Sequence, residues 1–127
     1  MDQPETVALH DRMGIEILEA TAERVVGVLP VLGNTQPSGL LHGGASCVLA
    51  ESLGSIGATL HAGPDQVAVG VDINATHHRA ARGGVVTGVA VPVHRGRTVA
   101  TYDVVITDDQ ERRVCSARIT CQLISKA

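Results

Sequence analysis

Residues 36–62 read QPSGLLHGGASCVLAESLGSIGATLHA, a glycine-rich loop followed by a stretch that we predict to be one long helix. The helix should begin near His42 or Gly43 and continue to about Leu60, because Gly63 and the proline after it supply a C-cap and a stop. At about 1.5 Å per residue, this helix is roughly 30 Å long, close to the width of a small domain. We therefore expect the rest of the chain to wrap around it.

The predicted helix has two different faces. Large apolar residues recur at helical spacing and form one broad stripe, made of Ala45, Val48, Leu49, Ser52, Leu53, Ile56 and Leu60. The other face holds small residues that let another backbone come close, namely Cys47, Ala50, Gly54, Gly57 and Ala58. We expect both faces to be buried.

Glu51 lies on the shoulder between these faces, and Ser55 follows one turn later. The predicted helix contains no Lys or Arg that could pair with this carboxylate. A mid-helix Glu is usually a surface residue, but burying an unpaired carboxylate is costly unless the group is used. Glu51 is therefore the strongest candidate for a catalytic group.

The composition limits the possible classes of protein. The 127 residues suffice for one domain with one core, residues 1–127, and the net charge of −3 without any basic run argues against nucleic acid as a partner. Tyr102 is the one aromatic residue, so the core must come from Val, Ile, Leu and Ala. Three cysteines without CxxC spacing, and no apolar run of about 18 residues, indicate a cytoplasmic protein with no membrane partner.

About six antiparallel strands are expected around the helix. Residues 15–20 and 24–31 read as a hairpin, after a loose N-terminal segment of about residues 1–10 in which residues 6–13 could form a helical turn. After the helix, Val67, Val69, Val71 and Ile73 alternate with small or polar residues, which predicts a strand with one buried face.

Further strands are predicted at 85–93, 98–107 and 112–125, each following its predecessor through a short turn. Residues 67–125 should therefore form a four-stranded antiparallel meander. One helix and these strands give an α+β architecture in which a curved sheet wraps the helix. Because one helix cannot cover both faces of a sheet, and the helix has a small-residue face, we expect a homodimer.

Several separated segments together resemble the hotdog-fold acyl-CoA thioesterases. They are the run from Gln36 to Ser46, the groups Leu49-Ala50-Glu51 and Leu53-Gly54-Ser55, the run Asn74-Ala75-Thr76-His77-His78-Arg79, and His94-x-Gly96-Arg97. Within that superfamily they resemble the phenylacetate-type branch, which includes 1,4-dihydroxy-2-naphthoyl-CoA, 4-hydroxybenzoyl-CoA and enterobactin-proofreading thioesterases. The resemblance implies a hotdog fold, hydrolysis of an aryl- or hydroxyaryl-CoA ester, menaquinone biosynthesis as a pathway, and dimers that pair into a homotetramer.

The resemblance also implies a role for each residue of the catalytic site. The Gly43 backbone N–H and the Gln36 amide would polarise the thioester carbonyl, His42 would orient the loop, and Ser55 would hold the attacking water. Glu51 would act as nucleophile or as general base, and both roles stay open. Since Glu51 follows Gly43 by about 12 Å along one helix, the two must come from different subunits, with the active site at the dimer interface.

The binding of the CoA tail follows from the same resemblance. It falls on Gly70, on His77, His78, Arg79 and Ala80, and on His94, Arg95, Gly96, Arg97, Thr98 and Val99. The arginines in these strand ends suit phosphate contacts. CoA is part of the substrate, so no separate cofactor is implied. His77 and His78 face opposite ways on a strand, and no carboxylate or Cys cluster accompanies them, so we expect no metal site.

Two departures and two other functions keep the substrate open. Ser38 lies where relatives can carry an aromatic residue, and the chain has no Phe or Trp to pack an aryl ring, so an aliphatic acyl group stays possible. A hotdog enoyl-CoA hydratase or dehydratase would change the absorbance of a 2-enoyl-CoA without releasing thiol. A non-catalytic acyl-CoA-binding protein would bind these esters and turn over none of them.

Overall fold

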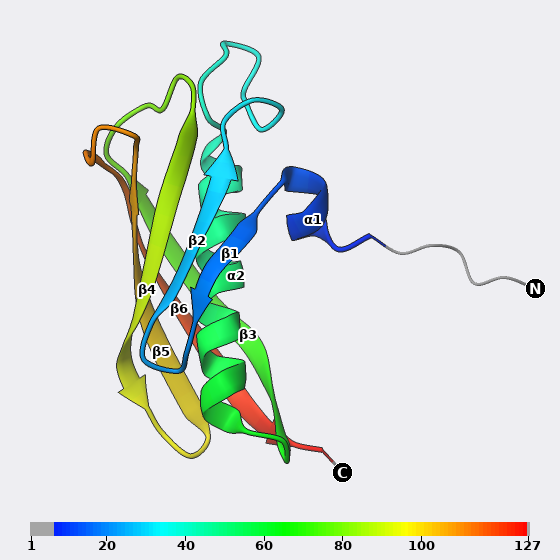
Figure 1. The fold of residues 1–127 in the computed structure, drawn as a ribbon. Coiled ribbons are helices and arrows are strands. Elements are labelled where there is room, and N and C mark those ends of the chain that lie inside the picture. The colour runs from blue at the N-terminus through cyan, green and yellow to red at the C-terminus, as the bar shows by residue number, and fades with distance from the viewer. Residues whose placement is uncertain (1–6, 127) are drawn as a thin grey trace, which may run out of the picture.

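One antiparallel sheet curls around one long helix in the computed structural model, which describes residues 7–126 (Figure 1). The helices are α1 (Leu9–Met13) and α2 (Gly43–Ala62), and the strands are β1 (Glu16–Ala20), β2 (Val25–Pro30), β3 (Gln66–His77), β4 (Val85–Arg95), β5 (Val99–Thr107) and β6 (Arg113–Ser125). The predicted α+β architecture is confirmed. Neither helix within residues 7–126 has the length and hydropathy needed to cross a membrane.

The central helix has the start that the sequence predicted and ends two residues later than expected. His42 is the N-cap residue, with an extended backbone, and Gly43 is the first helical residue. The helix ends at Ala62, where Gly63 takes a φ of 78° and donates its N–H to the carbonyl of Thr59. Gly63 is thus the C-cap because a positive φ is cheap for glycine alone.

The strand order corrects the predicted meander. The order is β1-β2-β4-β5-β6-β3, so β4, β5 and β6 follow one another, but β3 pairs with β6 and not with β4. Residues 78–84 carry the chain past the start of α2 to the far side of β5, where β4 pairs with β2. Three strand spacings amount to about 14 Å, which seven residues can span. Because such a connection is as short as a hairpin loop, the sequence does not distinguish the two.

The core lies between α2 and the concave face of the sheet, and both Leu49 and Leu53 are fully buried there. The small-residue face of α2 also packs inside the chain: a Cβ on Gly54 would lie 1.8 Å from Cγ2 of Ile119 in β6. That face therefore packs α2 onto its own sheet. The sequence had suggested instead that a second copy would cover it. Leu60, predicted in the apolar stripe, is instead 49% exposed.

Gly54→Ala should lower the free energy of unfolding by about 1–3 kcal/mol or more, because the added methyl forces α2 away from β6. The effect should exceed the gain in helix propensity of about 1 kcal/mol. Urea unfolding measures it. Gly83→Ala is the matched control, since a Cβ there would meet nothing within 4 Å. Equal midpoints for both variants would contradict this packing.

The strand β3 is a free edge of the sheet and exposes an apolar surface. Val67, Val69, Val71 and Ile73 are 37–58% exposed, so the prediction that they form a buried face is wrong for the single chain. The prediction failed because alternation shows that one face is apolar, not which molecule covers it. An unpaired strand of 12 residues with β-branched side chains is a surface on which another strand can pair.

The helical turn expected within residues 6–13 is present as α1 (Leu9–Met13), which packs against α2. Leu9 and His10 belong to it, so the expected loose segment of residues 1–10 does not extend to these two residues. Gly14 ends this helix with a φ of 84°. Residues 1–6 of the expected loose segment lie outside the described part of the chain.

Candidate active site

The first turn of α2 leaves one backbone N–H without a partner. The Nδ1 atom of His42 accepts the N–H of Gly44 at 2.8 Å, and the His42 carbonyl accepts the N–H of Ala45 at 2.9 Å. Among residues 7–126, the N–H of Gly43 has no acceptor. It also lies at the positive end of the helix dipole. Gly43 can therefore donate to a carbonyl oxygen placed beside the helix start.

His42 has a defined part in this arrangement. Because its Nδ1 accepts a hydrogen bond, the proton of the neutral ring is on Nε2. The imidazole thus takes the place of the Ser or Asp side chain that commonly caps a helix. By satisfying Gly44, His42 holds the start of α2 in place and leaves the neighbouring N–H of Gly43 exposed to a ligand.

Asn34 holds the loop that precedes α2. Its Nδ2 donates to the carbonyls of Met13 and Pro30, both at 2.8 Å, and its own carbonyl accepts the N–H of His42 at 2.9 Å. These bonds connect the loop to the end of α1, to β2 and to the helix cap. Sequence reasoning missed Asn34, because the asparagine lies in a stretch that reads only as a polar loop.

A cavity of about 310 Å³, which we call the Gly43 cavity, opens at the start of α2. Six of the predicted site residues line it: Gln36, Gly43, His77, His78, Arg79 and Ala80. The ring of His77 lies against Gly43, where an added Cβ would be 3.0 Å from Nε2. His78 has its Nε2 2.9 Å from Oγ of Ser116. The structure thus brings the expected carbonyl donors and one of the two expected CoA segments together.

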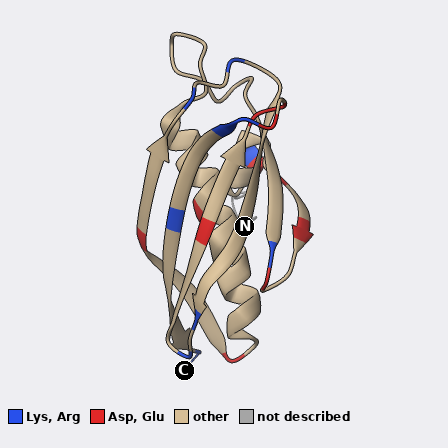
Figure 2. Cartoon of the chain, turned by 90° about the vertical axis from the view of Figure 1, so that its left-hand side faces the viewer, with Lys and Arg blue, Asp and Glu red and all other residues tan. Residues whose placement is uncertain are grey.

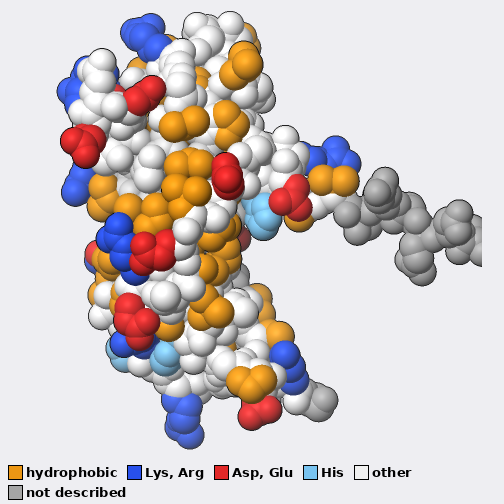
Figure 3. Space-filling model, in the orientation of Figure 1, with side chains coloured by type: hydrophobic (Ala, Val, Ile, Leu, Met, Phe, Trp, Pro, Cys, Tyr) orange, Lys and Arg blue, Asp and Glu red, His pale blue; other side chains and the backbone are white. Residues whose placement is uncertain are grey.

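Glu51 lies in a different cavity, of about 390 Å³, between α2 and the α1 segment. We call it the Glu51 cavity. Its lining is mostly apolar and consists of Ala8, Leu9, His10, Val48, Glu51, Ser52, Ser55 and Ile56. Hydrophobic side chains gather along this face of the molecule (Figure 3). The Glu51 side chain is exposed in the single chain and has no ion-pair or hydrogen-bond partner within residues 7–126. It is thus free to contact a ligand.

The carboxylate of Glu51 reaches the free edge of the sheet. A Cβ on Gly70 of β3 would lie 3.4 Å from Oε2 of Glu51. Glycine at this position therefore leaves room for the carboxylate. Gly70, which the resemblance assigned to CoA binding, is a neighbour of Glu51 within the same chain.

Ser55 also lines the Glu51 cavity, and its side chain contacts strand β6 of the sheet. Its Oγ lies 4.0 Å from Sγ of Cys121, which is buried in β6. Burial raises the pKa of the Cys121 thiol, and the nearby charge of Glu51 raises it further. Cys121 therefore stays a neutral thiol beneath Ser55. Sequence reasoning placed His10 in a loose segment and missed that it lines this cavity.

The second predicted CoA segment, residues 94–99, lies at the other end of the molecule. It comprises the end of β4, the turn after it and the first residue of β5, and the 11 residues of β4 span about 35 Å from the end where the Gly43 cavity opens. At this far end, Nε2 of His61 lies 2.7 Å from the carbonyl oxygen of Gly96. His61 thus ties the C-terminal end of α2 to the β4–β5 turn. One chain therefore does not bring residues 77–80 and 94–99 together.

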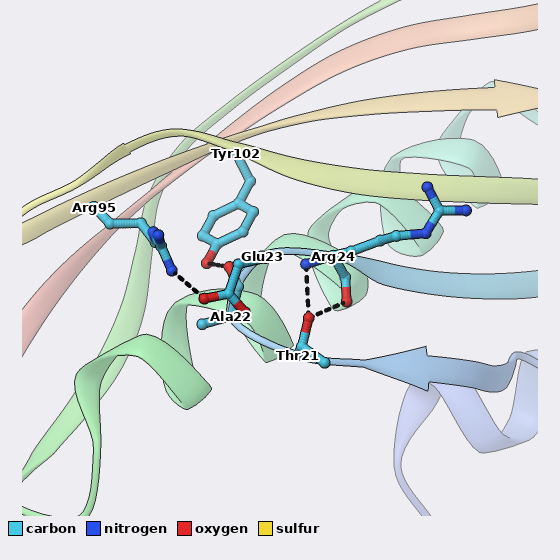
Figure 4. A network of polar contacts seen from close by, with 6 residues as sticks. All are labelled: Thr21, Ala22, Glu23, Arg24, Arg95 and Tyr102. Carbon is cyan, nitrogen blue, oxygen red and sulfur yellow. Dashed lines mark hydrogen bonds and ion pairs between the residues drawn. The ribbon is translucent and has the colours of Figure 1, made fainter.

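Arg95 is engaged in a local network rather than facing a cavity (Figure 4). Its Nη1 donates to Oε1 of Glu23 at 2.9 Å, and the Tyr102 hydroxyl donates to the carbonyl of Ala22 in the same turn. The hydrogen bond from Arg95 holds the pKa of the Glu23 carboxyl below its usual value. These contacts pin the β1–β2 turn to the sheet, so Arg95 has a structural partner of its own.

The comparisons with known proteins are consistent with one another. Residues 38–115 match the family described as Thioesterase superfamily. A Bacillus subtilis (strain 168) protein named as an esterase, ComA2, is 48% identical over 99% of this chain and 100% of its own length. The proofreading thioesterase EntH of Cronobacter sakazakii is 44% identical over 91% of this chain and 80% of its own length.

Solved structures show the same fold. A thioesterase from Haemophilus influenzae superposes with a TM-score of 0.88 and 35% identity, covering 91% of this chain and 82% of that protein. A thioesterase protein from Streptococcus pneumoniae TIGR4, whose structure was solved with coenzyme A, has a TM-score of 0.79 and 25% identity, covering 87% of this chain and 86% of that protein.

Proposed function

Because the chain belongs to the thioesterase superfamily, with its hotdog fold, and is a thioester hydrolase, we propose that its substrates are acyl-CoA esters with an aryl or hydroxyaryl acyl group. The observation that supports a thioester substrate is the backbone N–H of Gly43, which has no acceptor in the described part of the chain and lines one cavity with Gln36. A donor at the helix start is suited to the oxygen of a thioester, on which negative charge develops during attack. The CoA-bound relative from Streptococcus pneumoniae supports the choice of CoA.

In the proposed reaction, the thioester oxygen accepts hydrogen bonds from the Gly43 N–H and the Gln36 amide. Glu51 either attacks the carbonyl carbon, forming a mixed anhydride that water then opens, or takes a proton from the water that attacks. In both routes the C–S bond breaks, and the acid and the CoA thiol are released. A thiol with a pKa of about 8.5 leaves readily as the thiolate, so the site needs no strong acid beside the sulfur.

We propose that the complete site forms between two copies of the chain. Gly43 and Glu51 line separate cavities of one chain and are about 12 Å apart along α2, too far to contact one carbonyl. Glu51 lies beside Gly70, a residue of the free edge strand β3. The exposed apolar side chains of β3 would be covered by β3 of a second copy. Twofold pairing of these edges would place Glu51 of each copy at the interface. Two such dimers would then pair into a homotetramer.

Val71→Lys should prevent this dimerisation and reduce activity with it. Val71 is 58% exposed on β3. In the proposed pairing of two β3 strands, a lysine at this position would be buried with its charge unpaired. Sedimentation velocity at micromolar concentration should show a monomer, and thiol release should fall in parallel. Val93→Lys, on β4 and 52% exposed, is the matched control. A dimeric, fully active Val71→Lys variant would contradict the proposed interface, as would a monomeric wild type.

The Glu51 cavity is the proposed site of the acyl group. Leu9, Val48 and Ile56 give it apolar walls, and the carboxylate lies among them, where the acyl carbonyl carbon must arrive. This wall holds no aromatic side chain, so a planar ring would pack against aliphatic groups. If the substrate is 1,4-dihydroxy-2-naphthoyl-CoA, the enzyme would act in menaquinone biosynthesis. We propose that it does so in the cytoplasm.

Thiol release across a series of CoA esters tests the proposed substrate class. The series is benzoyl, hydroxybenzoyl, hydroxynaphthoyl, phenylacetyl and straight-chain acyl-CoA at equal concentrations. We expect the highest kcat/KM for the hydroxyaryl esters. A preference for straight-chain esters would overturn the aryl assignment and leave the thioesterase assignment intact. Binding of all esters without thiol release would instead contradict the proposal of acyl-CoA hydrolysis.

A further inference from the structure

The segment around α1 forms one wall of the Glu51 cavity, which we call the α1 wall. Ala8, Leu9 and His10 make up this wall, and the other lining residues belong to α2, against which α1 packs. Glu51 acts in the proposed reaction and the resemblance assigns Ser55 to the water, but no role falls to the α1 wall. The volume of about 390 Å³ is enough for an aromatic acyl group. The α1 wall is therefore placed to contact the part of the acyl group that does not react.

Among residues 7–126, His10 is the one polar side chain that the α1 wall contributes to the lining. The imidazole is 37% exposed, so a ligand in the cavity can reach it. Its Nε2 lies 3.1 Å from Oδ1 of Asp11. A carboxylate oxygen attracts the ring proton, which favours the neutral tautomer with the proton on Nε2 and leaves Nδ1 as an acceptor. His10 is therefore suited to a ligand group that donates a hydrogen bond.

The charge around the Glu51 cavity favours a neutral group over an anion. In the part of the chain that the structure describes, no Lys or Arg lines this cavity, whereas Glu51 brings a negative charge. Many of the basic residues lie instead on strands of the sheet and in the loops at its ends (Figure 2). A second carboxylate on the acyl group would therefore be repelled and would meet no cation. A phenolic hydroxyl is neutral and has an O–H to donate.

We propose that Nδ1 of His10 accepts a hydrogen bond from a ring hydroxyl of the acyl group and so sets a preference for hydroxyaryl over unsubstituted aryl esters. This inference rests on the proposed function, since it needs an aryl acyl group in the Glu51 cavity. His10 lies on a different helix from Glu51, so it acts on the choice of acyl group and not on the attack at the carbonyl carbon. It is thus a specificity-determining residue.

Values of kcat/KM for benzoyl-CoA and for 2-, 3- and 4-hydroxybenzoyl-CoA test this role, because these esters share the CoA part and the thioester. The wild type should prefer at least one hydroxy ester over benzoyl-CoA by about three- to tenfold, the net effect of one neutral hydrogen bond. His10→Leu, which keeps an apolar side chain of similar reach but has no acceptor, should reduce this ratio to about one. Because the ratio compares two substrates of one protein, a partly unfolded variant does not change it.

Two variants separate the hydrogen bond from other effects. His10→Asn should keep most of the preference, because its amide oxygen can take the position of Nδ1. Arg12→Ala removes an exposed charge from the same helix, at a position outside both cavities, and should keep the wild-type ratio. An unchanged ratio in His10→Leu would overturn the proposal. So would loss of the preference in Ser52→Ala alone, since Ser52 is the competing polar group of the lining.

Calorimetric binding of phenacyl-CoA and its hydroxyphenacyl isomers, thioethers that the enzyme cannot hydrolyse, gives a readout without turnover. The wild type should bind at least one hydroxyphenacyl isomer about three- to tenfold more tightly than phenacyl-CoA, and His10→Leu should bind the two equally. Equal affinities in the wild type would overturn the proposal. If the wild type released no thiol from any of the aryl esters, the proposed function would be refuted instead, and the thioether affinities would still decide the role of His10.

Discussion

Glu51→Gln should lower kcat for thioester hydrolysis by a factor of about 10²–10⁴, whichever of its two proposed roles is correct. The amide can neither attack the carbonyl carbon nor accept a proton from water. KM should change little, because the side chain makes no contact that would hold CoA. The fold should also be unaffected, since Glu51 is exposed and has no partner in the described chain that the change could remove. Thiol release under saturating substrate measures the loss.

Glu16→Gln is a matched control, because it removes an exposed carboxylate from β1, away from both cavities. It should retain wild-type kcat. Single-turnover hydrolysis in ¹⁸O-labelled water then separates the two roles. If Glu51 is the nucleophile and water opens the anhydride at the Glu51 carbonyl carbon, the label enters the Glu51 carboxylate, whereas a general base never takes it up and leaves all of it in the product acid. Near-normal thiol release by Glu51→Gln would remove Glu51 from the mechanism altogether.

Gly43→Pro should lower kcat by a factor of about 10²–10³, the cost of removing one donor from a developing oxyanion. Proline suits this position: Gly43 is the first residue of α2, where proline is favoured, and His42 before it has φ −68° and ψ 132°, the extended backbone that precedes proline. The substitution thus removes the N–H with little cost to the helix. Initial rates and circular dichroism together measure the two effects.

Gly43→Ala separates the loss of the donor from simple crowding. It keeps the N–H and adds a Cβ that would lie 3.0 Å from Nε2 of His77, a tight contact that a small movement of the ring can relieve. Gly43→Ala should therefore lose much less activity than Gly43→Pro. Equal losses would show that space at Gly43 matters and that the N–H does not.

Local patterns in the sequence were sufficient for the elements of the fold but not for every pairing. The start of α2 could be predicted because His42 and the two glycines after it mark a helix N-terminus, and the strands could be predicted from their alternation. The placement of β3 at the far edge could not, since residues 78–84 have the length of a hairpin loop. Which molecule covers Val71 is likewise a property of the assembly and not of the strand.

The residues of the candidate site likewise fall into those that the sequence could group and those that it could not. Gln36, Gly43 and His77 could be grouped from the motifs, and they do share one cavity. The α1 residues at the Glu51 cavity had no motif, because His10 reaches α2 only through a tertiary contact. Residues 94–99 were grouped with His77 by resemblance, yet they lie at the opposite end of the sheet. One chain therefore does not bring these segments together, just as it does not bring Gly43 and Glu51 together, which is the premise of the proposed dimer.

Mixed dimers test the central claim, that Glu51 of one protomer acts with Gly43 of another. Glu51→Gln and Gly43→Pro are each purified, unfolded together in equal amounts and refolded, so that subunits reassort. If the site is shared, half of the dimers are mixed and each has one intact site, giving about one quarter of wild-type activity. If each site is built within one chain, every site carries a defect, and the mixture should be no more active than the two variants measured apart.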